Sequence, residues 1–94
     1  MRERKIMGLT PEMLEPYREY LMDEERSRAT VEKYLRDARK FLEYLGDDGR
    51  VDKEKVREFK QELMEHYKIS SVNSMLAAVN SFLGFVGRGD LKVK

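Results

Sequence analysis

Apolar side chains recur every three or four positions through residues 27–46, and this spacing constrains the fold more than any other feature of the sequence. In an α-helix, residues three and four apart lie on one face, so such a stripe must be buried against another element. Ser27 or Thr30 can cap the start of this helix, and Gly46 can end it. The stripe consists of Val31, Tyr34, Leu35, Ala38, Phe41, Leu42 and Leu45.

An earlier segment shows the same periodicity. Thr10 is an N-cap candidate and Pro11 suits the first helical position. The spacing predicts a helix that runs to about Arg26, although Pro16 restricts Glu15 and can delay the regular helix until there. Its apolar positions are Met13, Leu14, Tyr17, Tyr20, Leu21 and Met22.

Two more helices are predicted nearer the C-terminus. Asp52 caps one that ends around His66, and Ser70 and Ser71 begin another that Gly87 stops. No stretch alternates like a strand over more than a few residues, so we expect an all-α fold of four helices joined by short turns. The inward positions are Val56, Phe59, Leu63 and Met64, then Val72, Met75, Leu76, Val79, Phe82, Leu83 and Val86.

The length of 94 residues allows one domain with a single small core. The absence of cysteine excludes disulfides and thiolate metal sites. No apolar run approaches the roughly 20 residues that cross a bilayer, and the basic start lacks a signal-peptide core, so we expect a cytoplasmic protein with no membrane partner. Residues 1–8 are predicted to be a leader, 9–87 the domain, and 88–94 the start of a linker.

Charge is distributed unevenly, although the net charge is only +1. Residues 1–26 and 47–67 each hold five basic and seven acidic side chains. Residues 27–46 hold five basic and three acidic ones, and residues 68–94 hold four and one. The second and fourth helices are therefore basic together with their flanks, which weakens the objection that a low net charge raises against a nucleic-acid partner.

The second predicted helix carries a row of cations. Lys33, Arg36 and Lys40 are spaced three and four apart, so they share a face, expected opposite the apolar stripe. Arg28 and Thr30 stand at the start of the helix, where free backbone N–H groups, a hydroxyl and an arginine can bind a phosphate. The alternative is that the row is a solvated face without a partner.

The segment from Ile69 to Gly87 contains no charged residue in a chain that is 39% charged. Its outer face must then be small and neutral. Such a face can be buried, as in a central helix, or it can enter a major groove, where Asn and Ser can bind base edges. Both can hold for parts of one helix. The face consists of Ser70, Ser71, Asn73, Ser74, Ala77, Ala78, Asn80 and Ser81.

The second helix also carries an ordered motif, formed by Ser27, Thr30, Tyr34, Asp37 and Phe41 with apolar residues between them. It resembles the S-x-x-T-hydrophobic-x-x-Y-x-x-D-hydrophobic-x-x-F segment of phage-integrase-like tyrosine recombinases. The resemblance continues through residues 51–59, 69–73 and 76–85 and covers about residues 9–86. It implies a four-helix, SAM-like core-binding domain. In that family the domain clamps one side of a recombination site, and a separate C-terminal domain closes on the other side and performs strand exchange.

The resemblance also implies which residues bind DNA. In the family the second and fourth helices approach the major groove, which agrees with the charge distribution. Lys33, Asn73 and Ser74 are predicted to read bases, and the others to bind phosphates. Neighbouring recombinase protomers are expected partners on DNA, and the isolated domain is expected to be a monomer. The predicted set is Arg28, Thr30, Lys33, Arg36, Lys40, Lys68, Ser70, Ser71, Asn73 and Ser74.

No catalysis is expected of this chain. The family's tyrosine nucleophile and its supporting arginines, lysine and histidines lie on the C-terminal domain, and nothing after Gly87 supplies them. The five tyrosines are interpreted as packing residues with a solvated hydroxyl. His66 lacks a second ligand at metal spacing, and residues 47–49 lack the ligand order of an EF-hand and indicate a turn. No catalytic residue, metal or cofactor is therefore predicted.

The main alternative function is a helical protein–protein interaction or dimerisation module that does not bind DNA. Clustered exposed apolar residues on the first and fourth helices would favour it. If the domain does bind DNA, the low net charge predicts weak binding in isolation, because few phosphates would be neutralised.

Overall fold

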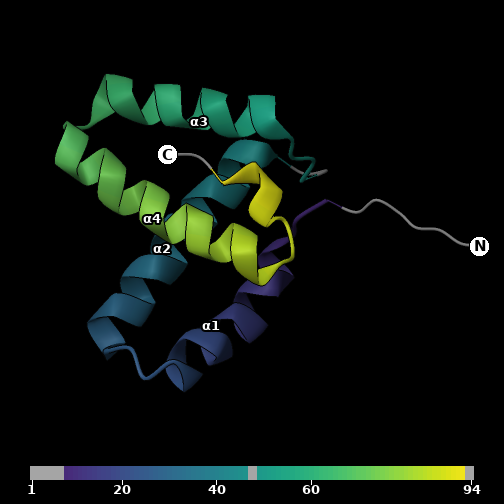
Figure 1. Cartoon of the computed structure of the whole chain (residues 1–94), viewed down its shortest axis with the longest axis vertical. Coiled ribbons are helices and arrows are strands. Elements are labelled where there is room, and N and C mark those ends of the chain that lie inside the picture. Colours follow the sequence, from purple (N-terminus) through teal and green to yellow (C-terminus); the bar gives the residue numbers. More distant parts are fainter. Residues whose placement is uncertain (1–7, 47–48, 93–94) are drawn as a thin grey trace, which may run out of the picture.

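The computed structural model describes residues 8–46 and 49–92, which form helices and no strand, and it confirms the all-α prediction. Four α-helices lie between two 3₁₀ turns within these residues (Figure 1). Their bounds are η1 Pro11–Met13, α1 Leu14–Asp23, α2 Arg28–Leu45, α3 Lys53–His66, α4 Ile69–Phe85 and η2 Gly89–Leu91.

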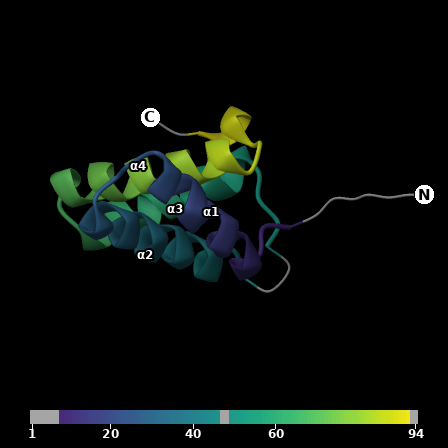
Figure 2. The ribbon, with the colours of Figure 1, turned by 90° about the horizontal axis from the view of Figure 1, so that it is seen from below.

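Helix α4 is the centre of the packing. It crosses in front of α2 in Figure 1, with α3 above the crossing and α1 below it. Figure 2 shows α4 and α2 as two layers, one above the other. The predicted inward positions Val72, Met75, Leu76, Val79, Phe82 and Leu83 of α4 are buried, whereas of its small neutral face only Ala78 is buried.

Aromatic pairs join the layers. The rings of Phe41 on α2 and Phe59 on α3 meet edge to face, with centroids 5.0 Å apart. Tyr17 on α1 meets Phe82 on α4 in the same way at 5.1 Å. Each such pair contributes about 0.5–1.5 kcal/mol beyond the burial of its area. The four helices therefore share one core.

The predicted N-caps are present at the starts of α2 and α3. The Ser27 hydroxyl accepts a hydrogen bond from the Thr30 N–H at 3.2 Å, and the Asp52 carboxylate accepts one from the Lys55 N–H at 2.8 Å. Gly46 ends α2 with a φ of 91°. Thr10 precedes η1 but makes no side-chain cap bond.

Helix α1 begins and ends as its residues dictate. Pro16 falls in the first turn, where its missing N–H costs no intrahelical bond. The helix ends at Asp23, before the predicted Arg26. It ends there because Glu25 takes a left-handed φ of 61°, which turns the chain towards the extended Ser27 cap of α2.

Several predicted side-chain positions are wrong, since Tyr20 and Met22 of the predicted apolar face of α1 are exposed. Met64 is 45% exposed, because Leu63 beside it already fills the inner position of α3 and successive helical residues point about 100° apart. Ala78 was expected on the outer face of α4 but is fully buried. Helices α1, α2 and α3 all pack against α4, so the buried arc of α4 is wider than a single stripe.

The N-terminal segment is held to the turn between α2 and α3. The Leu9 N–H donates to the Gly49 carbonyl at 2.8 Å, and the Leu9 side chain is buried in the core. Gly49 has a φ of 63°, and a Cβ there would lie 2.0 Å from the Leu9 carbonyl oxygen. Only glycine fits this approach. The leader, apart from Gly8, and the turn residues 47–48 lie outside the described residues.

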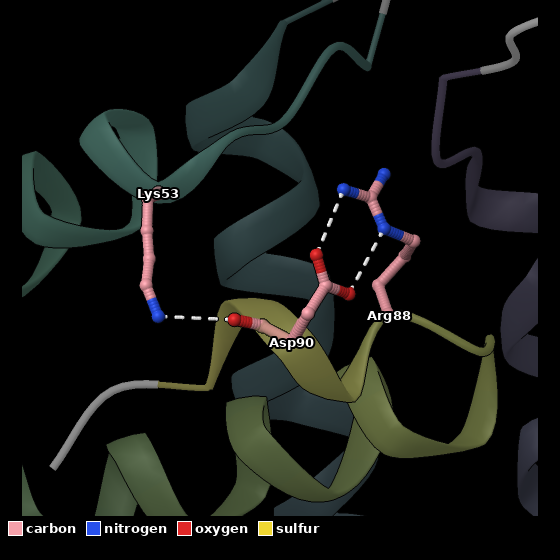
Figure 3. Close-up of polar contacts among 3 residues, drawn as sticks. All are labelled: Lys53, Arg88 and Asp90. Carbon is pink, nitrogen blue, oxygen red and sulfur yellow. Dashed lines mark hydrogen bonds and ion pairs between the residues drawn. The ribbon is translucent and has the colours of Figure 1, made fainter.

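The C-terminal segment folds back onto the start of α3. Lys53 donates to the Asp90 carbonyl at 3.0 Å, and Arg88 donates to both carboxylate oxygens of Asp90 at 3.3 and 3.4 Å (Figure 3). These bonds from Arg88 lower the pKa of Asp90. Leu91 is buried in the core. Residues 88–91 are therefore packed on this domain, and a role as the start of a linker stays a prediction.

Candidate nucleic-acid interface

The N-terminal halves of α2 and α4 lie towards the same side of the molecule, at the left of Figure 1. The contact that joins them is made by Lys33, whose Nζ donates to the carbonyl oxygen of Ser74 at 3.3 Å. Residues 41 positions apart in the sequence are thus brought together. Through this contact, the predicted site residues of α2 and those of α4 adjoin each other at Lys33 and Ser74.

An open groove runs between the cationic side of α2 and the start of α4. From α2 it is lined by Arg36, Arg39 and Lys40 together with the acidic Asp37 and Glu43, and from the other side by Tyr67 and Met75. The Lys40 ammonium lies 5.9 Å from the centroid of the Tyr67 ring, a cation–π distance. Arg36 and Lys40 are exposed, so their charges are available to a ligand in this groove.

The start of α2 is only partly free to bind an anion. The Ser27 side chain occupies the Thr30 N–H and also donates to the Thr30 hydroxyl at 2.9 Å, and the Ser27 carbonyl accepts from the Val31 N–H. Arg28 is exposed and Thr30 is half-buried. The guanidinium of Arg28 is therefore the more accessible group at this end of α2.

The start of α4 differs, because its N-cap position is Lys68, which makes no side-chain cap bond. No acidic residue lies in the first turn. The ammonium of Lys68 and the positive end of the helix dipole therefore act in the same direction. Ser70, Asn73 and Ser74 are exposed, and Ser71 is half-buried.

Lys33 is placed differently from the other predicted cations. Its side chain is only 33% exposed, and its ammonium donates to the carboxylate of Asp37 one turn further along α2. Asp37 is 6% exposed and is the one buried charged residue of the described chain. The expectation that Lys33 lies on a solvated face opposite the apolar stripe is therefore wrong.

Three residues of this surface were missed from the sequence: Asp37, Arg39 and Tyr67. Arg39 stands three positions after Arg36, so helical spacing alone could have placed it on the groove. Asp37 was identified only as part of the family motif. Tyr67 was interpreted as a packing residue, yet it is 41% exposed and lies over the groove.

The tyrosine hydroxyls show one further departure from expectation. Tyr17 is fully buried, and its hydroxyl donates to Ser81 Oγ at 2.9 Å, so it is not solvated. Burial raises the pKa of Tyr17 to about 12. Burial, followed by the nearby Glu58 and Glu62 carboxylates, also raises the pKa of Tyr44. Both hydroxyls stay protonated near neutral pH and are unsuited to nucleophilic attack there.

Other site types find little support in the described chain. His66 is exposed, and its Nδ1 lies 3.0 Å from the Glu62 carbonyl in the last turn of α3. No group of three or more His, Cys, Asp or Glu side chains there is arranged to hold a metal ion. None of the described helices combines the length and hydropathy needed to cross a membrane.

Comparison with known proteins gives one match. A search of curated proteins and a search of solved structures returned none. The family described as "Phage integrase, N-terminal SAM-like domain" matches residues 14–88, from the start of α1 to just beyond the end of α4. The matched region includes α2, α4 and the groove between them. The chain therefore belongs to the N-terminal SAM-like domain family of phage integrases, a non-catalytic part of these recombinases.

Proposed function

We propose that this domain binds the double-stranded DNA of a recombination site through α2 and the N-terminal half of α4, and that a separate C-terminal domain performs strand exchange. The observation that carries the proposal is the groove itself. It lies between the exposed cations of α2 and the Tyr67 and Met75 side chains at the start of α4, and the same helix start exposes Ser70, Asn73 and Ser74, which can form hydrogen bonds.

The chemistry of the groove suits a duplex. Arginine and lysine bind phosphate oxygens by charge, and serine and threonine hydroxyls add hydrogen bonds to the same oxygens. The small exposed side chains of α4 allow its backbone to approach the base edges, where Asn73 and Ser74 can form hydrogen bonds. The proposed phosphate-binding residues are Arg28, Thr30, Arg36, Lys40, Lys68, Ser70 and Ser71.

Electrostatics sets the expected strength. The net charge is +1, and the basic residues are spread through the sequence, with Arg36, Arg39 and Lys40 brought together at the groove. A protein that neutralises few phosphates binds weakly and loses affinity steeply as salt is added. Binding by the isolated domain is therefore expected to be weak, dependent on low salt and confined to this face.

The alternative function, a protein-interaction module, requires exposed apolar residues clustered on α1 and α4. The exposed ones are Tyr20 and Met22 on α1 and Ile69 at the start of α4, with Met64 and Tyr67 beside Ile69 in the chain. Helix α1 and the start of α4 lie apart in Figure 1. These residues do not form one patch, so the DNA-binding proposal is preferred, with neighbouring protomers as partners only on DNA.

The test is an NMR titration of the domain with a short duplex at low salt, following each backbone amide. We expect shifts concentrated in residues 28–40 and 67–77 that disappear when salt is added. An absence of shifts at low salt, or concentration-dependent shifts on α1 and α4 without DNA, would refute the proposal and favour self-association.

A further inference from the structure

We infer that Lys33 is a positioning residue, which sets the arrangement of α2 against α4 and does not itself contact DNA. The inference rests on the proposed DNA-binding function and deepens it. It concerns a residue that helical spacing assigns to the same cationic row as Arg36 and Lys40.

The charge of Lys33 is already paired within the protein. Its ammonium is bound to the Asp37 carboxylate, and that carboxylate is almost fully buried. A buried carboxylate without a cationic partner is strongly unfavourable. Moving the ammonium out to a phosphate would leave Asp37 in that condition. The paired charges also cancel, so Lys33 adds little to the field that a phosphate experiences.

Lys33 also contacts α4. The same ammonium donates to the Ser74 carbonyl, a backbone atom in the middle of the proposed binding surface. One side chain thus holds a carboxylate of α2 and the backbone of α4 together. Because Asn73 and Ser74 are the proposed base readers, the position of their backbone relative to the α2 cations decides whether both can engage one duplex.

The other two cations of the row on α2 are placed differently from Lys33. Arg36 lies one turn beyond Lys33, is exposed and has no ion pair in the part of the chain that the structure describes. Lys40 is also exposed, and its ammonium lies at cation–π distance from the Tyr67 ring. The row therefore divides into two exposed cations, Arg36 and Lys40, and one that is bound in an ion pair.

The experiment measures DNA affinity by fluorescence anisotropy with a 16-base-pair duplex over a series of salt concentrations. Four proteins are compared: wild type, K33M, the double variant K33M/D37N and the matched control R36M. Each lost phosphate contact lowers the slope of log affinity against log salt by about 0.9. A positioning residue alters affinity while leaving that slope unchanged.

For R36M we expect weaker binding and a slope reduced by about 0.9. For K33M we expect affinity to fall severalfold with the wild-type slope, because the contacts remain but are displaced. For K33M/D37N we expect affinity to stay below the wild-type value, again with the wild-type slope, because no charge is then buried but the bond to the Ser74 carbonyl is still missing. The double variant decides the matter if K33M does not fold.

A slope reduced in K33M/D37N as much as in R36M would overturn the inference and make Lys33 a direct contact. Failure of the proposed function looks different, since wild type itself would then not bind the duplex at low salt.

Discussion

Helices α1 and α3 differ from α2 and α4 in the charge at their N-terminal ends. Glu15 lies in the first turn of α1 and Glu54 in that of α3, whereas the first turns of α2 and α4 contain no acidic residue. An acidic side chain there neutralises the positive end of the helix dipole. Acidic residues therefore do not neutralise the dipole at the starts of α2 and α4, although Ser27 already caps the Thr30 N–H at the start of α2.

A net charge near zero therefore conceals a difference between helices in where their acidic residues lie. The acidic helices stabilise the fold through their own dipoles and through the core. The other two carry exposed cations or neutral hydrogen-bonding groups beside one groove. Substitutions on either pair of helices can test whether this difference matters for DNA binding.

The largest expected effect is on DNA affinity. Reversing two charges on α2, in R36E/K40E, should lower affinity by on the order of 100-fold at low salt, because two attractions become repulsions at the phosphates. The matched control R18E/R57E makes the same change in net charge on exposed positions of α1 and α3. Fluorescence anisotropy with a short duplex measures both. Equal losses in the two variants would mean that net charge alone governs binding.

A second pair of variants separates the packing of α4 in the core from its proposed contact with DNA. Ala78 is fully buried and Ala77 beside it is exposed. Ala78→Leu should cost about 1–3 kcal/mol of unfolding free energy by overpacking. Ala77→Leu should change stability by less than about 0.5 kcal/mol and instead obstruct the approach of α4 to DNA. Urea denaturation and anisotropy together check this. Reduced binding by a folded Ala78→Leu but not by Ala77→Leu would contradict the assignment of the outer face.

The sequence was sufficient to predict the features that depend only on neighbouring residues, such as helix caps and helix ends. The caps at Ser27 and Asp52 and the end of α2 at Gly46 depend on hydrogen bonds within a few residues. The apolar stripe of α2 depends only on helical spacing, and it was predicted correctly. The family motif added the order of these elements.

The sequence was insufficient where the answer depends on other helices. Ala78 is buried because several helices pack around α4, which no spacing within α4 reveals. Lys33 has the same spacing as Arg36 and Lys40, yet only the fold shows that it bonds the Ser74 carbonyl 41 residues away. The cationic row was therefore predicted as a set, while the different state of one member was not.

A smaller effect is expected on the acidic side of the comparison. Tyr17→Phe in α1 removes the bond to Ser81 and should cost about 1 kcal/mol of unfolding free energy without changing DNA affinity. The pKa of Tyr17 is about 12 in the folded protein, and near 10 when unfolded. The neutral hydroxyl therefore stabilises the fold fully below pH 10, and this contribution is lost as pH rises towards 12.

Urea denaturation at several pH values measures this contribution. The decline in stability between pH 10 and 12 should be smaller in Tyr17→Phe than in wild type. An identical decline in the two proteins would mean that Tyr17 ionises as readily in the folded state as in the unfolded one.

The smallest effect concerns the start of α4. Lys68 has φ and ψ of −72° and 160°, close to the −63° and 157° of the Ser27 cap, so a serine at position 68 can cap α4 without strain. Lys68→Ser should therefore raise the unfolding free energy by roughly 0.5–1 kcal/mol. It should also weaken DNA binding and lower the salt slope by about 0.9, because one phosphate contact is lost.

The control is Ser27→Ala, which removes an existing cap and should destabilise the domain by about 1 kcal/mol. Urea denaturation and anisotropy of both variants measure the two quantities. If Lys68→Ser is more stable but binds DNA as tightly as wild type, the start of α4 is not a phosphate contact. If Lys68 leaves the start of α4 uncapped in order to bind a phosphate, Lys68→Ser should lower DNA affinity and raise the unfolding free energy together.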